Sequence, residues 1–301
     1  MKAERMKFGE VTFTSGGVDC HAWHFTGEGD ALATEAGRPV VVMAHGLAGT
    51  KDSGLQPFAE ALAAAGLDAF AFDYRGFGSS GGSPRQTVSM VGQLEDYRAA
   101  MAAAARLPGV DPQRIVLWGT SLAGGHVFSA AAGRDDVAAV VALTPLVDGM
   151  AAGRHALASH TKGEILRSTV AGFRSKWGKP VMMPVVAPPG QFGAMTIEGS
   201  MDDYLSIAGP TWVNEIDAAV GLELGGHRPI KSAGDVTAPT LVQIADFDRS
   251  APPQASAKAA FAARAEVRHY PCDHFDVYPG KDWYDAVVAH QLSFLTRVLA
   301  P

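Results

Sequence analysis

The chain has 301 residues, about twice the usual length of a single domain, although α/β enzymes of this size often fold as one unit with an insertion. Its composition, 47% hydrophobic and 19% charged, excludes intrinsic disorder and predicts a large buried core. The formal net charge is −6, from 25 Lys plus Arg against 31 Asp plus Glu. No basic surface for phosphate contacts is therefore expected, so nucleic acid is excluded as a partner.

Short apolar runs alternate with amphipathic segments along most of the chain, after an antiparallel entry hairpin. The alternating residues 11–13 and 18–25 flank a Ser-Gly-Gly turn at 15–17. Continuous apolar runs follow at residues 40–44, 69–72, 115–118, 137–143 and 240–244. Such runs are expected for parallel strands that are covered on both faces. With helical stretches between them, they predict an α/β fold with a mostly parallel, doubly wound sheet.

The alternation breaks at residues 147–238, which predicts a mostly helical insertion without a convincing strand. The rest of the chain, residues 1–146 and 239–301, is expected to form the main α/β domain. One helix of the insertion carries an apolar stripe formed by Leu166, Val170, Phe173 and Trp177. The proline-rich residues 180–190 forbid regular structure. From residue 149 to 238 there are eight basic and eight acidic residues, so the insertion is balanced in charge.

The turn at residues 119–124 has the pattern of a catalytic serine. Ser121 lies just after the strand that ends at Trp118 and just before an Ala-rich helix. A nucleophile elbow needs small residues two positions before and after the serine, because its strained backbone leaves no room for larger side chains. Gly119 and Ala123 meet this need, although Ala123 departs from the strict Gly-x-Ser-x-Gly pattern. We expect Ser121 to be the nucleophile; a serine that only caps the helix is the alternative.

A second Gly-x-Ser-x-Gly match at residues 78–82 places Ser80 as a rival nucleophile. It lacks the following helix, since Pro84 comes four residues later, and we interpret it as a loop. The same glycines at 76–81, with Asp96 beyond them, also match the letters of a dinucleotide fingerprint. A nicotinamide-dependent oxidoreductase is therefore the rival enzyme class, but the missing helix argues against it.

The acid and the base of a catalytic triad should follow Ser121 in that order. Asp248 is the preferred acid because it lies in the loop after a late strand, with Asp246 and Asp148 as alternatives. Of the ten histidines, His274 is the preferred base. It lies in a loop at the carboxyl edge of the sheet, whereas the other two histidines beyond Asp248 lie within a strand and a helix.

The segment after the first apolar strand is a candidate oxyanion loop. Gly46 lets the backbone turn closely, so that the N–H of Leu47 can point into the site beside the N–H of Leu122. Because backbone N–H groups are the donors, the oxyanion site does not need a particular side chain at either position. The side chain of His45 is interpreted as a core histidine.

Metal dependence is not expected. His21 and His24 are close in sequence, but residues three apart on a strand point to opposite faces, so they cannot easily share an ion. Cys20 and Cys272 are too few for a disulfide framework or a cysteine-rich zinc site and are interpreted as packing residues.

Taken together, these motifs resemble the α/β-hydrolase superfamily, over almost the whole chain apart from the insertion. Residues 73–80 resemble the family's Asp-x-Arg-Gly-x-Gly-x-Ser stretch, which also accounts for the apparent dinucleotide fingerprint. Residues 270–275 are similar to the loop before the family's catalytic histidine, although Cys272 and Asp273 replace the usual small residues. The opening at residues 45–52 is most similar to bacterial dienelactone hydrolases and acyl-peptidase-like hydrolases.

The resemblance implies a serine hydrolase that cleaves a carboxylic ester or related acyl bond of a small to medium, largely neutral molecule. The acyl-enzyme would form on Ser121, with Asp248 orienting His274, and no cofactor is implied. Thioester, lactone or short-peptide hydrolysis and acyl transfer use the same residues and stay open. A non-catalytic binding protein is the alternative outside enzymes. Dehalogenases and epoxide hydrolases of the superfamily have an aspartate at the position of Ser121, so both reactions are disfavoured.

The insertion is expected to cover Ser121 as a cap and to select the substrate, because it begins at the edge of the sheet where ligands enter doubly wound folds. Packing of the cap against the main domain is the alternative role for its apolar side chains. The candidate pocket residues are Phe173, Trp177, Met182, Met183 and Phe192.

No apolar run approaches the 18 or more residues that span a bilayer; residues 138–147 come nearest. Residues 1–7 carry positive charge but lead into no apolar segment of a secretory signal. We therefore expect a cytoplasmic protein with no membrane span. The sequence leaves open whether it forms a homo-oligomer.

Overall fold

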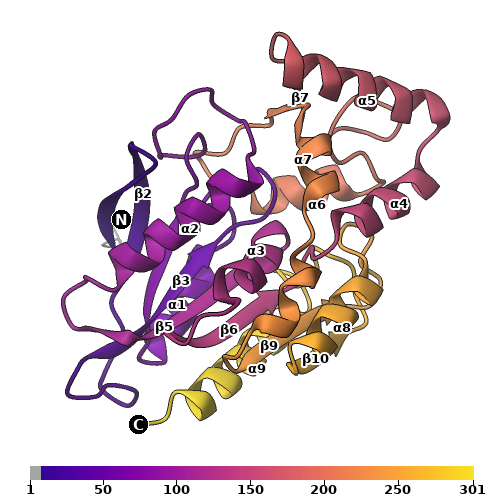
Figure 1. Ribbon diagram of the computed structural model, residues 1–301. Helices are drawn as coiled ribbons and strands as arrows, with labels where there is room; N and C mark the ends of the chain where they lie inside the picture. The colour runs from indigo at the N-terminus through magenta and orange to yellow at the C-terminus, as the bar shows by residue number, and fades with distance from the viewer. Residues whose placement is uncertain (1–7) are drawn as a thin grey trace, which may run out of the picture.

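The computed structural model describes residues 8–301 and contains a large sheet with helices on both faces (Figure 1). The strand order in its eight-stranded sheet is β1-β2-β4-β3-β5-β6-β9-β10. The strands are β1 (Gly9–Ser15), β2 (Val18–Phe25), β3 (Arg38–Ala44), β4 (Asp68–Phe72), β5 (Val110–Thr120), β6 (Val137–Leu143), β9 (Thr240–Ala245) and β10 (Glu266–Tyr270). Pairing is antiparallel for β1 with β2 and for β2 with β4, and parallel elsewhere. The predicted fold class is confirmed.

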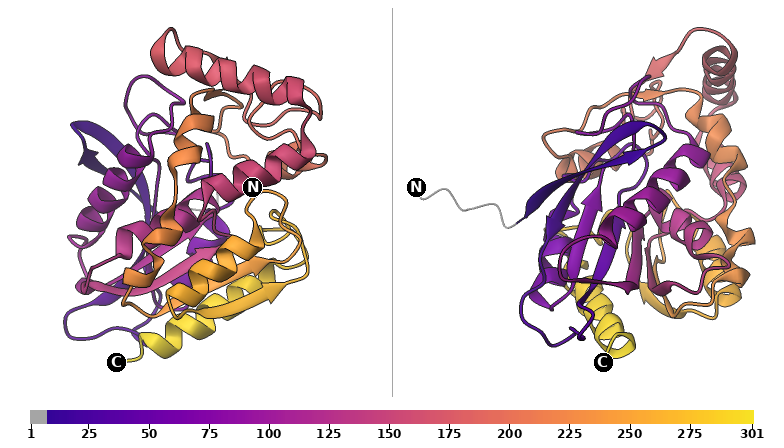
Figure 2. Two further views of the ribbon diagram at one scale, coloured as in Figure 1. Left: turned by 45° about the vertical axis from the view of Figure 1, so that its right-hand side comes forward. Right: turned by 60° about the vertical axis from the view of Figure 1, so that its left-hand side comes forward.

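Two layers of helices cover this sheet (Figure 2). One layer contains α1 (Gln56–Ala64) and α9 (Tyr284–Val298), which contact each other. The other contains α2 (Met90–Ala104), α3 (Leu122–Ala131) and α8 (Pro253–Ala262); α3 packs against α2 and against β5 and β6. Because both faces are covered, the apolar runs of the central strands are buried throughout, as in Val40 to Ala44.

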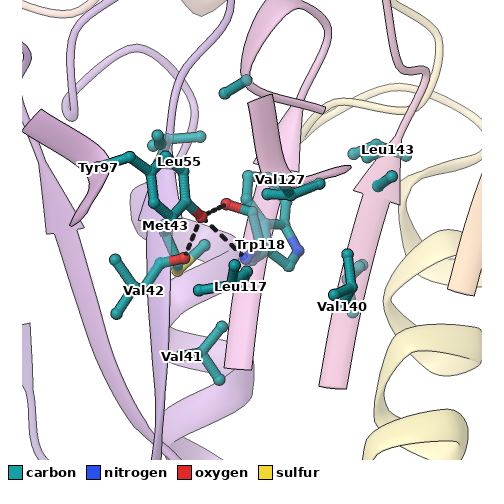
Figure 3. Close-up of a cluster of buried hydrophobic side chains, with 14 of the residues drawn as sticks. Val41, Val42, Met43, Leu55, Tyr97, Leu117, Trp118, Val127, Val140 and Leu143 are labelled. Carbon is teal, nitrogen blue, oxygen red and sulfur yellow. Dashed lines mark hydrogen bonds between the residues drawn. The ribbon is translucent and has the colours of Figure 1, made fainter. Parts of the chain in front are cut away.

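Strands β3 and β5 are joined at the centre of the core by a tyrosine from α2 (Figure 3). The Tyr97 hydroxyl lies 2.8 Å from the carbonyl oxygens of both Val42 and Trp118 and accepts a hydrogen bond of 3.1 Å from the Trp118 N–H. Tyr97 is fully buried, so these partners satisfy a hydroxyl that no water reaches. The contact fixes β5 three residues before Ser121.

The insertion between β6 and β9 contains helices and a very short sheet. Its elements are α4 (Gly149–Ser159), α5 (Lys162–Trp177), β7 (Met182–Met183), α6 (Ser200–Ile207), β8 (Ile216–Asp217), α7 (Val220–Gly226), η1 (Pro229–Lys231) and η2 (Ala233–Asp235). The pair β7 and β8 was not expected from the sequence; each strand has two residues, too few for a periodic pattern. Helix α5 begins at a capping box formed by Thr161 and Glu164 and forms an outer edge of the molecule (Figure 1).

Within residues 8–301 no helix combines the length and the apolar character that crossing a bilayer requires.

Buried histidines cluster around Tyr74, which is itself buried. The His45 ring lies 5.0 Å from the Tyr74 ring, His126 lies 6.0 Å from it, and His227 lies 4.9 Å from His126, measured between ring centroids. Burial lowers the pKa of all three imidazoles, and that of His227 to about 4. Each ring is therefore neutral in the folded protein near pH 7.

Acidification should destabilise the protein through these rings. The unfolded chain binds protons near the ordinary histidine pKa of about 6.5, whereas His227 in the folded chain binds one only near pH 4, so the free energy of unfolding falls between these pH values. At pH 5 the loss through His227 is about 2 kcal/mol. Urea unfolding at pH 7.5 and 5.0 should show a smaller pH-dependent loss for His227→Gln than for the parent; equal losses would contradict the assignment.

Candidate active site

Ser121 lies on a tight turn between β5 and α3. Its backbone has φ of 55° and ψ of −116°, in a region that residues other than glycine rarely adopt. Gly119 permits the turn, because a Cβ atom there would lie 2.2 Å from the Ala123 carbonyl oxygen. The Ser121 N–H donates to the Leu143 carbonyl at 2.9 Å, and the Leu146 N–H donates to the Ser121 carbonyl at 2.8 Å. These contacts hold the serine at the carboxyl edge of the sheet.

The loop after β3 packs directly on the Ser121 side chain. A Cβ atom at Gly46 would lie 2.9 Å from the Ser121 Cβ and 3.4 Å from its Oγ, so only glycine leaves the space beside the hydroxyl open. Ala48 has φ of 54°, and the Gly49 N–H donates to the Gly46 carbonyl at 3.2 Å, which closes a tight turn around Leu47. The sequence-predicted oxyanion loop therefore lies next to Ser121.

Asp248 and His274 form a buried pair at the same edge. The loop after β9 carries Asp248 and the loop after β10 carries His274, and Asp248 Oδ2 lies 2.6 Å from His274 Nδ1. The other carboxylate oxygen accepts the N–H groups of Ser250 at 2.7 Å and Ala251 at 2.6 Å. Because both oxygens are occupied, the carboxylate and the imidazole are held in one orientation.

The electrostatics of this pair favour a charged imidazole. Burial alone lowers the pKa of His274, but the Asp248 carboxylate, with a smaller contribution from Asp273, raises it above the ordinary value. Asp273 is held by Arg249, whose guanidinium lies 2.5 Å from it. An imidazole with these neighbours can take a proton from a hydroxyl and keep it during a reaction.

The competing aspartates have other partners. Asp246 lies 2.6 Å from the Nδ1 atom of the exposed His269. Asp148 caps α4 by accepting the Met150 N–H at 3.0 Å, and it pairs with Arg228 at 2.9 Å. The structure therefore brings together Asp248 and His274 and leaves both alternatives elsewhere.

The rival serine is a structural residue. The buried Ser80 hydroxyl donates to the Asp73 carbonyl at 2.7 Å and accepts the His21 N–H at 2.8 Å. Asp96, which completes the letters of the dinucleotide fingerprint, binds the Arg75 side chain at 2.6 Å. The loop at 76–81 leads into further loop residues before α2 begins at Met90, so it does not meet a helix N-terminus.

A small pocket of about 30 Å³ opens where these loops meet. Its lining includes Gly46, Leu47, Ser121, His274, Met195 and Tyr204. Ser121 and His274 therefore line one pocket, beside the loop that carries Leu47. We call this space the catalytic pocket.

Three lining residues of the catalytic pocket come from the insertion and were missed from the sequence: Met195, Tyr204 and Ile207, the last residue of α6. The Tyr204 hydroxyl, on α6, donates to the Leu47 carbonyl at 2.7 Å. Met195 lies in the loop before α6 and reaches the same pocket. None of the three belongs to a motif, so only the folded chain reveals that they line the same pocket as Ser121.

A larger cavity of about 280 Å³ lies between α5 and α7, and we call it the α5–α7 cavity. Met183 and Phe192, two of the predicted pocket residues, line it. Ala194 and Thr196 also line it, while Met195 between them lines the catalytic pocket. Neighbouring side chains of an extended segment point to opposite sides, so residues 194–196 form part of the wall between the two spaces.

The other three predicted pocket residues lie elsewhere. Met182 is half-buried in β7 and lines neither space. Phe173 and Trp177 lie on the outer side of α5, where their side chains are exposed and their rings stack with centroids 5.1 Å apart. The sequence spacing predicts that Phe173 and Trp177 share one face of a helix with Leu166 and Val170. The spacing does not show whether that face packs on the protein or faces solvent.

Metal-ligand geometry is absent from the part of the chain that the structure describes: no three His, Cys, Asp or Glu side chains there converge on a common point. His24 lies 2.6 Å from Asp68, which also pairs with Arg38 at 2.7 Å.

A family model described as alpha/beta hydrolase fold matches residues 39–281 of this chain. The quorum-quenching protein AidA of Acinetobacter baumannii is 35% identical over 296 residues, which cover 96% of this chain and 95% of that protein. Thiohydrolase aneE of Aspergillus aculeatus is 32% identical over 159 residues, 50% of this chain and 49% of that protein.

A third relative, polyketide transferase grgF of a Penicillium species, is 31% identical over 149 residues, which cover 49% of this chain and 48% of that protein. The crystal structure of the alpha/beta hydrolase GrgF from Penicillium has a TM-score of 0.76 to this structure at 21% identity. That alignment covers 98% of this chain and 100% of the Penicillium chain, so the two share a fold over their whole length.

Replacing Asp248 by asparagine should lower the pKa of His274. The carboxylate that raises this pKa is lost, and burial, which lowers it, remains. The imidazole Cε1–H resonances followed by NMR from pH 5 to 9 would measure the change. Asp246→Asn is the matched control, because it removes a carboxylate from His269 instead. An unchanged His274 titration in Asp248→Asn would contradict the assignment of the pair.

Proposed function

Because the chain belongs to the alpha/beta-hydrolase family, we propose that it is a serine hydrolase that cleaves a carboxylic ester or a related acyl bond. The observation that carries this proposal is the 2.6 Å hydrogen bond between Asp248 and His274 at a pocket that Ser121 also lines. A serine on an elbow beside a buried carboxylate–imidazole pair is the arrangement that acyl transfer to serine requires.

In the first half of the reaction, His274 takes the proton of the Ser121 hydroxyl while Oγ attacks the carbonyl carbon of the substrate. Asp248 holds Nδ1, which leaves Nε2 as the base, and it stabilises the imidazolium that forms. The imidazolium then gives its proton to the leaving group, and the acyl group stays on Ser121. In the second half, His274 takes a proton from water as the oxygen of that water attacks the acyl carbon. The bond between this carbon and Oγ then breaks, His274 returns its proton to Oγ, and the carboxylic acid leaves.

The negative charge on the substrate oxygen needs donors beside Ser121. The N–H groups of Leu47 and Leu122 are our candidates, because Leu47 lies in the loop that packs on Ser121 and Leu122 is the first residue of α3. The N-terminus of α3 also places its free N–H groups and the positive end of its dipole at this position.

In this proposal the inserted segment, residues 147–238, acts as a cap that selects the substrate. The catalytic pocket of about 30 Å³ has room for little more than a water molecule, so a bound substrate needs further space. The α5–α7 cavity of about 280 Å³ lies beyond Met195, whose flexible side chain can move aside. With Met183 and Phe192 on its walls, this cavity suits an apolar acyl or alcohol chain.

Thioester hydrolysis or acyl transfer is a second candidate, because two of the relatives are named a thiohydrolase and a polyketide transferase. The same residues would act, with a thiolate as the leaving group or with another acceptor in place of water. One acyl group offered as an oxygen ester, a thioester and a lactone, with and without added alcohol acceptors, would separate these reactions.

Ser121→Ala should abolish labelling by a fluorophosphonate probe and reduce turnover of a p-nitrophenyl ester by roughly four orders of magnitude or more. Ser80→Ala is the control, since Ser80 bonds only backbone groups and should not form the adduct. Peptide mapping of the labelled protein identifies the modified serine. Undiminished labelling of Ser121→Ala would overturn the proposed nucleophile.

Met183→Ala should shift the preference toward longer acyl or alcohol chains, because it enlarges the α5–α7 cavity. Met182→Ala is the matched control: the neighbouring methionine lines neither space, so its replacement should leave the ranking of chain lengths unchanged. Turnover of p-nitrophenyl esters from two to twelve carbons measures the ranking. The fluorophosphonate reaction of each variant reports whether the site is intact. The same ranking in both variants would remove the support for a role of the cavity in specificity.

A further inference from the structure

Helix α5 carries its apolar residues on the side that faces solvent. Leu166, Val170, Phe173 and Trp177 are 64%, 47%, 45% and 74% exposed, and we call these four residues the α5 stripe. The opposite side packs on the insertion through small residues: Ala171 and Ser175 are buried, and a Cβ atom at Gly172 would lie 3.1 Å from the Ala218 carbonyl oxygen. A surface helix normally shows the reverse arrangement.

Side-chain hydrogen bonds attach α5 to the rest of the insertion with the stripe exposed. The Ser175 hydroxyl bonds the Asp217 carboxylate of β8, and the Lys176 side chain bonds Glu223 of α7 at 2.6 Å. At the C-terminal end of the stripe, the Phe173 and Trp177 rings stack at an interplanar angle of 12° and form a flat aromatic surface. Helix α5 also forms an outer edge of the molecule, accessible to a large partner (Figures 1 and 2).

The sequence segment that contains the stripe is rich in basic residues. Residues 161–179 contain five basic residues and one acidic residue, a net charge of +4 in a chain whose net charge is −6. The basic residues are Lys162, Arg167, Arg174, Lys176 and Lys179, of which Lys176 is paired with Glu223 of α7. Arg174 and Lys179 line a shallow surface depression together with Phe173 and Trp177, so cations and aromatic rings lie side by side.

We propose that the α5 stripe docks on the surface of an anionic phospholipid bilayer, with α5 parallel to the membrane plane. Exposed Leu, Phe and Trp side chains flanked by Lys and Arg are the features of a helix that binds such an interface. A second copy of the chain is the other occupant to consider. A two-fold contact along α5 would bring two segments of charge +4 together, and like charges repel. An anionic surface neutralises the same residues, so the charge favours lipid.

The proposed docking site lies next to the α5–α7 cavity. Arg167 and Phe192 line both this cavity and the groove beside Leu166 and Val170, and the Arg167 guanidinium lies 4.6 Å from the Phe192 ring. An apolar molecule dissolved in the bilayer would therefore meet the cavity on the face of the protein that touches the lipid. This last step rests on the proposed function, whereas docking itself does not.

Cosedimentation with vesicles tests the docking. The parent chain should bind vesicles of phosphatidylglycerol, release them in 0.5 M salt, and fail to bind vesicles of pure phosphatidylcholine. Leu166→Ser combined with Trp177→Ser should reduce the partition coefficient more than tenfold, because both side chains would leave the lipid. Arg174→Gln combined with Lys179→Gln should reduce it roughly 30-fold, from about 1 kcal/mol for each charge.

Matched controls lie outside α5. Phe261→Ser on α8, where Phe261 is 88% exposed, should leave vesicle binding unchanged. The same is expected of Arg98→Gln on α2 combined with Arg106→Gln in the turn after that helix. The fluorophosphonate reaction of all variants should equal that of the parent, which separates a failure of docking from a failure of the catalytic proposal.

Three outcomes would overturn the proposal. Absence of binding to phosphatidylglycerol would exclude the lipid partner, and equal binding to phosphatidylcholine would exclude the role of charge. A dimer in analytical ultracentrifugation that dissociates in Leu166→Ser with Trp177→Ser, without vesicle binding by the parent, would show that a second copy occupies the stripe.

Discussion

The close approach of Gly119 to Ala123 is the steric constraint on which the site depends. No side chain fits at position 119, since a Cβ atom would lie 2.2 Å from the Ala123 carbonyl oxygen, and Ser121 in the same turn has a positive φ of 55°. A conformation of this kind costs about 1–3 kcal/mol. Buried hydrogen bonds to Leu143 and Leu146, together with the packing of α3 on β5 and β6, offset the strain. The core thus stabilises a half-buried serine in a conformation that the local sequence alone would not hold.

Buried carboxylates form hydrogen bonds that connect the other loops around the site. Asp248 binds two backbone N–H groups of its own loop and the ring of His274, which joins the loops after β9 and β10. Asp73 acts in the same way between the loops after β3 and β4. It lies 2.6 Å from both the side-chain and the backbone nitrogen of Lys51 and accepts the Ser79 N–H at 2.9 Å. Because each acid is buried and fully bonded, the loops meet the serine in fixed positions.

Local sequence patterns were sufficient to predict the fold and the residues at strand ends. Residues that follow a strand of a parallel sheet lie at its carboxyl edge, which is why Ser121, Asp248 and His274 could be proposed to meet. The strands before Ser121 and Asp248 were located from their continuous apolar runs, whereas β10, before His274, has no such run. The sequence contained less evidence for choosing between Asp248 and Asp246, because both follow β9. Only the folded structure shows which of the two contacts His274. In the insertion, periodicity located α5 but could not tell that its apolar stripe faces solvent, since that depends on the small residues packed behind it.

The insertion does more than surround the catalytic pocket, because Tyr204 connects it to the loop that packs on Ser121. Its hydroxyl is bonded to the Leu47 carbonyl at 2.7 Å, and its ring lies 5.1 Å from Trp212 and 5.7 Å from Phe275, the residue after His274. Burial raises the pKa of Tyr204 far above its ordinary value, so the hydroxyl keeps its proton and remains a donor. A movement of α6 would therefore displace the Leu47 carbonyl, which belongs to the same residue as the candidate oxyanion donor, the Leu47 N–H. The position of α6 in the insertion is thus coupled to the geometry of the loop beside the serine.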